Sequence, residues 1–114
     1  MTQLFAQGDL LIERVDDILS CGAILTAAGD GAMVLAEGEV SGHRHALYGE
    51  VAMFRDDSLA WDIPPELYVG HVRVQGPSAR LEHDEHDAIS LPRGTYRVRR
   101  QRELEPRDAR IVAD

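Results

Sequence analysis

The chain has 114 residues, of which 44% are hydrophobic and 28% charged, a composition typical of one soluble globular domain over residues 1–114. Its 20 acidic residues outnumber its 12 basic residues and give a formal charge of −8, so a polyanion would be repelled and nucleic-acid binding is not expected. A single cysteine, the lack of a signal-peptide pattern and the lack of a long apolar run predict a cytoplasmic protein without a membrane segment.

The first half of the chain contains a series of short apolar segments that predict strands. The segment GDLLIERVDDI begins with a turn at Gly8-Asp9 and predicts a first strand. The segment LSCGAILTAAGDG ends in Gly-Asp-Gly, which indicates a hairpin turn. The segment AMVLAEGEV predicts the next strand, and HRHALYG and EVAMFRDD predict two more, separated by a turn at Gly49.

The second half repeats this pattern with longer segments. A turn is expected at residues 56–58, and Pro64 and Pro65 exclude WDIPPEL from a central strand or a helix interior, because they remove two backbone donors. The segments LYVGHVRVQG and TYRVRRQREL alternate between two faces, as strands do, and a turn is predicted between them at residues 92–94. The segment RDARIVAD predicts a final short strand or a tail.

Turn residues recur every eight to twelve positions or so, which is typical of an all-β sandwich or barrel. No segment keeps a helical period over three turns, and the best helical candidate, LFAQGDLLIERVDDIL, is interrupted by Gly8. The sequence therefore predicts a single all-β domain, a barrel or a sandwich, with little helix.

His43 and His45 lie one residue apart and are followed by Glu50. In a strand, residues i and i+2 share a face, with Cα atoms roughly 7 Å apart. Two imidazoles on one face can converge on a metal ion, at a metal–nitrogen distance of about 2.0–2.1 Å. The alternative is a solvent-facing strand that happens to carry two histidines.

Three further histidines lie downstream. His83 and His86 flank acidic residues in EHDEHD, and they share a side only if this stretch forms a turn. The surrounding carboxylates could support metal-binding imidazoles, although a solvated acidic loop would have the same sequence. His71 lies in an alternating segment, where it is either a third ligand or a packed or edge histidine.

These residues resemble the motifs of the cupins, small β-barrels that hold a metal among strand histidines. The first cupin motif matches Gly38, then His43-Arg44-His45, then Glu50. The second matches Pro92-Arg93-Gly94 but has Arg97 where the family has its last histidine. The resemblance implies a cupin-like barrel in which His43, His45 and Glu50 are metal ligands and His71, His83 or His86 replaces the missing one. The chain is also similar to small uncharacterised bacterial or phage proteins with QGD near the start and LP-x-G-x-Y near the end.

Three functions remain open from the sequence. The first is a small metal-binding cupin-like protein holding Fe(II), Mn, Ni or Zn, whose open coordination position would allow Lewis-acid or oxygen chemistry; whether it is an enzyme stays undecided. The second is a non-catalytic β module that acts through edge strands and Trp61, as a homo-oligomer such as a dimer or on a protein partner. The third is an anion sensor that uses Arg97, Arg99, Arg100 and Arg102.

Overall fold

The structure, a computed structural model, describes residues 3–16, 23–25, 32–37 and 44–101. These residues form eight strands and two short 3₁₀ helices, and no α-helix occurs among them, which confirms the all-β prediction. The elements in chain order are β1 (Leu4–Gln7), β2 (Leu10–Val15), β3 (Ala23–Leu25), β4 (Ala32–Glu37), β5 (Arg44–Tyr48), β6 (Val51–Arg55), η1 (Asp57–Ala60), η2 (Pro65–Leu67), β7 (Tyr68–Glu82) and β8 (Ile89–Arg100).

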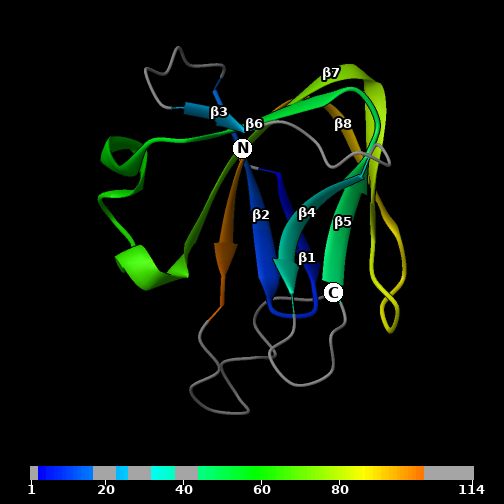
Figure 1. Ribbon diagram of the computed structural model, residues 1–114, viewed down its shortest axis with the longest axis horizontal. Coiled ribbons are helices and arrows are strands. Elements are labelled where there is room, and N and C mark those ends of the chain that lie inside the picture. Colours follow the sequence, from blue (N-terminus) through cyan, green and yellow to red (C-terminus); the bar gives the residue numbers. More distant parts are fainter. Residues whose placement is uncertain (1–2, 17–22, 26–31, 38–43, 102–114) are drawn as a thin grey trace.

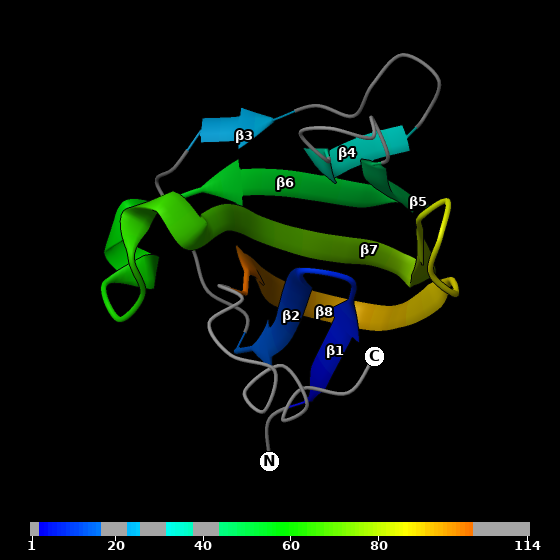
Figure 2. The same ribbon diagram turned by 90° about the horizontal axis from the view of Figure 1, so that it is seen from below.

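All of these strands belong to one antiparallel sheet with the order β1-β2-β8-β7-β5-β4, and β6 pairs with both β7 and β3. The long β7–β8 hairpin is the centre of this sheet (Figures 1 and 2). On the edge of β7 that does not pair with β8, the strands β5 and β6 follow each other along β7. Tyr48 at the end of β5 pairs with Arg80, and Val51 at the start of β6 pairs with Val74. The predicted turn at Gly49 is therefore the short break between two strands that pair with successive stretches of β7.

The sheet bends sharply where β7 has more residues than its neighbours. Between the pairs Val74–Gly94 and Ser78–Pro92, the register shifts, since β7 advances further than β8. Extra residues in one strand of an antiparallel pair bend and twist that strand. Figure 1 shows β7 and β8 curving over at this point, so that the two halves of the sheet face each other. The turn predicted at residues 92–94 is wrong, because the chain continues through it as one bent strand.

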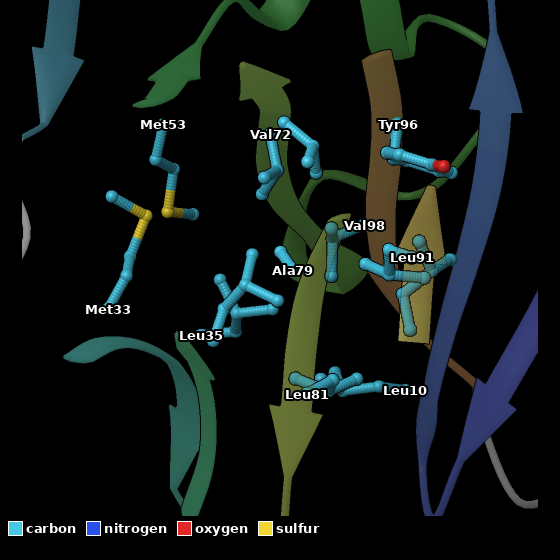
Figure 3. Packing of buried hydrophobic residues seen from close by; sticks show 13 residues of the cluster. Leu10, Met33, Leu35, Met53, Val72, Ala79, Leu81, Leu91, Tyr96 and Val98 are labelled. Atoms are coloured by element: carbon cyan, nitrogen blue, oxygen red, sulfur yellow. The ribbon is translucent and has the colours of Figure 1, made fainter. Parts of the chain in front are cut away.

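The folded sheet encloses one apolar core. Figure 3 shows side chains from β2, β4, β7 and β8 pointing toward one another across it. This packing follows from the alternation in the sequence, because every second residue of a strand faces the same side. Full burial of each large aliphatic side chain contributes roughly 1.5–3 kcal/mol. The buried cluster consists of Leu10, Ile12, Met33, Leu35, Leu47, Met53, Val72, Val74, Ala79, Leu81, Leu91, Tyr96 and Val98.

The segment between β6 and β7 contains η1 and η2 and forms a second, small apolar cluster of Ala60, Ile63 and Tyr68. The diproline lies outside the strands, as predicted. Trp61 is 85% exposed and does not join the core. Within the described ranges, no helix is long and apolar enough to cross a membrane.

The N-terminal strand β1 was not predicted, although it pairs with β2 over four residues. The turn after it, at Gly8-Asp9, is where the sequence predicts it. The hairpin turn expected at residues 29–31 and the final strand expected in RDARIVAD lie outside the described residues.

Candidate functional site

Three separate segments meet at the end of the sheet where β1 turns into β2. The β1–β2 turn contributes Gly8 and Asp9, β5 contributes His45, and the loop between β7 and β8 contributes His83 and His86. The ring centroids of His45 and His83 lie 4.3 Å apart, those of His83 and His86 4.7 Å, and those of His45 and His86 6.4 Å. We refer to His45, His83 and His86 as the histidine cluster.

Gly8 allows the three rings to come this close. Its φ is +58°, a left-handed conformation that favours glycine. A Cβ atom at this position would lie 2.8 Å from His86 Nε2 and 3.2 Å from His45 Cε1. Any other residue would therefore strain the turn and push the rings of the histidine cluster away.

The side chain of Gln7 fixes the orientation and the tautomer of His45. Its Nε2 donates hydrogen bonds to the carbonyl oxygens of Leu81, at 3.0 Å, and Asp87, at 2.9 Å. Since carbonyls can only accept, the amide nitrogen must face them, and Oε1 is left 2.9 Å from His45 Nδ1. His45 Nδ1 therefore donates, and in the neutral ring Nε2 carries the lone pair.

That lone pair faces a carboxylate. His45 Nε2 lies 3.3 Å from Asp9 Oδ1, while the other Asp9 oxygen accepts from Arg100 Nη1 at 3.2 Å. His45 is buried, and Asp9 is half exposed at the mouth of the cluster. A neutral imidazole nitrogen and a carboxylate oxygen are both acceptors, so this contact is favourable only with a proton or a cation between them.

Burial disfavours the protonated, charged form of His45. Burial, together with a smaller effect of the neighbouring His83 and against an opposing effect of Asp9, lowers the pKa of His45 to about 4. The imidazole of His45 is therefore neutral near pH 7, which is the state in which a histidine ligates a metal.

His83 is held differently. Its Nδ1 accepts a hydrogen bond from the backbone N–H of Glu85 at 3.0 Å, so Nε2 carries the proton when the ring is neutral. A rotation of this ring would be needed before Nδ1 could contact an ion shared with His45. In agreement with this, no group of three or more His, Cys, Asp or Glu side chains in the described part of the chain is already arranged to hold a metal ion.

The remaining predicted ligands lie elsewhere or outside the described residues. His43 is not among the described residues. Glu50 is exposed in the break between β5 and β6, where its backbone oxygen accepts from Gln75 N at 2.8 Å. The structure thus brings together three of the six predicted ligands, His45, His83 and His86.

His71 occupies a separate, packed environment. Its Nδ1 lies 2.6 Å from the hydroxyl of Tyr68, and its ring stacks on Phe54 with a centroid distance of 5.2 Å. The Tyr68 hydroxyl also accepts from the backbone N–H of Asp56, so its own proton is donated to His71. Burial, with a smaller effect of Arg97, lowers the pKa of His71 to about 4.

A cleft of about 390 Å³ opens beside the histidine cluster. It shares Gln7 and His86 with the site, and the side chains of Glu85 and Asp87 give it an acidic rim. Such a rim favours a cation over an anion at this end of the sheet.

Gln7 and Asp9 were not recognised as site residues from the sequence. Both lie in the QGD segment, where Gly8-Asp9 was interpreted only as a turn, and nothing local indicates that this turn approaches histidines 36 or more positions away. Of the arginines considered for an anion site, Arg97 pairs with Glu13 and Asp62, and Arg100 pairs with Asp9. Arg102 lies outside the described residues.

A family model described as a domain of unknown function (DUF8820) matches residues 6–101, which include every described residue of this site. A search of curated proteins and a search of solved structures each found no match.

Proposed function

Because the chain belongs to the DUF8820 family, which has no assigned function, we propose its function from the site alone: it binds a divalent transition-metal ion through the histidine cluster and Asp9. His45 Nε2 and an Asp9 carboxylate oxygen are the first two ligands. His86, whose Nε2 points at Gly8 beside the His45 ring, is the third.

The observation that supports this proposal best is the 3.3 Å contact between His45 Nε2 and Asp9 Oδ1. The hydrogen bond from Nδ1 to Gln7 leaves a lone pair on Nε2, and the carboxylate adds a negative charge opposite it. A metal-binding histidine typically donates its second ring N–H to an oxygen in this way. The buried Gln7 amide is in turn fixed by two backbone carbonyls, so the donor is oriented before any ion arrives.

The ligand types indicate which ions suit the site. Imidazole and carboxylate together suit Fe(II), Mn, Ni or Zn, and two histidines with one carboxylate leave coordination positions open. His83 is the candidate for a fourth ligand, once its ring leaves the amide of Glu85. An ion held here would act as a Lewis acid toward a small molecule in the adjoining cleft.

We propose further that the resemblance to the cupins extends to the place of the site but not to its ligands. His45 corresponds to the second histidine of the cupin motif. Glu50, the motif's carboxylate, lies away from the cluster, and Asp9 would take over its role from the β1–β2 turn.

The experiment is to measure bound metal and Zn²⁺ affinity for tag-free protein and two variants. His45→Ala should lower the affinity by about 100-fold or more, because it removes the one ligand that is already oriented. Asp84→Asn removes a charge from the loop that carries His86 and leaves the three proposed ligands in the chain, and it should change the affinity by less than about threefold. Equal affinity of wild type and His45→Ala would refute the proposal.

A second candidate function rests on Trp61. Its 85% exposure on the segment that covers one end of the sheet is unusual for the only tryptophan of the chain, and tryptophan is enriched in interface centres. In this alternative the protein is an accessory module that forms a dimer or binds a protein partner through this segment. Light scattering over the micromolar range tests it, since Trp61→Ser should convert a dimer to a single chain.

A further inference from the structure

A second cleft, of about 560 Å³, lies at the opposite end of β2 from the histidine cluster. Four strand positions separate Leu10, next to the cluster, from Arg14 in this cleft, which corresponds to roughly 13 Å. The described residues that line it include three arginines, Arg14, Arg73 and Arg93, and no acidic residue. Its volume is in the usual range of small-molecule sites, about 300–1,000 Å³.

Arg14 is held in place by neutral groups. Its Nη1 donates to Gln3 Oε1 at 3.0 Å, and its Nη2 donates to the carbonyl oxygen of Arg93 at 2.7 Å. The guanidinium lies directly over Gly94, where a Cβ atom would be 2.8 Å from Nη2. The absence of a side chain at Gly94 therefore gives Arg14 its position, and its charge meets no carboxylate among the described residues.

Arg93 is similar. Its Nε donates to the carbonyl oxygen of Gly76 at 3.3 Å, which fixes the base of the guanidinium at the bend of the sheet. Its side chain is exposed, and no described carboxylate pairs with it. Arg93 therefore lines the cleft with an exposed side chain.

The contrast with other arginines is informative. Arg55, Arg80, Arg97 and Arg100 each pair with an aspartate or glutamate. In a chain with 20 acidic residues and a formal charge of −8, Arg14 and Arg93 are unusual, because within the described part of the chain their hydrogen bonds go to carbonyl and amide oxygens. Guanidinium groups recognise planar oxyanions by paired hydrogen bonds, and more than one of them complements a dianion.

We propose that this cleft binds the phosphate group of a small molecule, with Arg14 and Arg93 contacting its oxygens. Arg73, whose guanidinium carbon lies 5.6 Å from the centroid of the Phe54 ring, also lines this cleft. This site is independent of the histidine cluster, and it differs from the strand-face arginines at 97 and 100, whose charges are already paired.

The test is an NMR titration of the full chain with inorganic phosphate at constant ionic strength, with EDTA present so that no bound metal can hold the phosphate. We expect saturable shifts of the Gly94 and Thr95 amides, with a dissociation constant of about 1 mM, a weak but specific affinity. Arg93→Gln should weaken binding by about tenfold, because it removes charge-assisted hydrogen bonds without disturbing the core. The matched control is Arg80→Gln, an exposed arginine paired with Glu82 elsewhere on the sheet, which should bind as the wild type does.

Acetate, titrated in parallel, separates a phosphate site from a carboxylate site. Weaker binding of acetate than of phosphate supports the proposal. Equal binding of both, shifts that do not saturate, or an equal loss in Arg80→Gln and Arg93→Gln would each overturn it. The folded state of both variants is verified by the dispersion of the remaining amide signals.

Discussion

His45 and His71 are both buried imidazoles, exposed by 3% and 1%, and burial lowers the pKa of each to about 4. Their hydrogen bonds differ. His71 Nδ1 accepts the proton of the Tyr68 hydroxyl, a neutral donor within the fold. His45 instead donates from Nδ1 to Gln7 and presents the lone pair of Nε2 to the carboxylate of Asp9.

The difference separates a structural histidine from a candidate ligand. Burial and a lowered pKa are common to both, so neither property identifies a site. What distinguishes His45 is that its remaining nitrogen faces an acceptor beside two more imidazoles, which is a favourable arrangement only for a cation. In His71 the protein itself satisfies the lone pair.

The largest expected effect concerns pH and His71. Between pH 6.5 and about pH 4 the unfolded chain binds a proton at His71 and the folded chain does not. The contribution of neutral His71 to the free energy of unfolding is therefore fully present above pH 6.5 and is lost as the pH falls toward 4. This residue alone should account for about 3 kcal/mol of that loss. Urea unfolding of wild type and His71→Leu at several pH values measures it; the variant should show a flatter pH dependence, and equal slopes would contradict the prediction.

The next effect concerns Gln7, which distinguishes the surroundings of His45 from those of His71. Gln7→Met keeps the volume but removes the acceptor for His45 Nδ1–H, so the ring loses its fixed tautomer. Zn²⁺ affinity measured by competition with a chelator should fall by about 10–100-fold, the usual effect of removing such a partner. Unchanged affinity would show that Gln7 does not orient a ligand.

Tyr68→Phe removes the hydrogen-bond partner of His71, as Gln7→Met removes that of His45. It leaves His71 Nδ1 and the Asp56 N–H without their hydroxyl partner, and the free energy of unfolding should fall by about 1–2 kcal/mol. Metal content should stay the same, because nothing near His45 is altered. A loss of metal in this variant would mean that the two histidine environments are coupled.

The smallest effect is expected at Trp61. Since its side chain is 85% exposed, Trp61→Ser should change the free energy of unfolding by no more than about 0.5 kcal/mol. Chemical denaturation at low protein concentration measures this change. A larger loss of stability would show that the tryptophan is covered in solution, as the dimer alternative requires.

Much of the strand pattern could be predicted locally. The segments that became β2, β4, β5, β6 and the first half of β7 alternate or carry short apolar runs between turn residues, and that period is a property of the strand itself. The bend at residues 92–94 could not be predicted, because Pro92 and Gly94 suit both a tight turn and a bulged strand. Whether these residues form a turn or a bent strand depended on the extra residues of β7 that lie opposite Pro92 and Gly94.

The sequence by itself determined that the chain is all-β and that its histidines are concentrated in a few strand and loop segments. Only the tertiary structure decided which of them meet. His45 joins His83 and His86 because β5 pairs with the end of β7 that leads into their loop, whereas His71 lies at the other end of β7, beyond the bend. Gln7 and Asp9 reach the cluster through the pairing of β2 with β8, and no local pattern contains such long-range contacts, because they depend on strand order rather than on side-chain period.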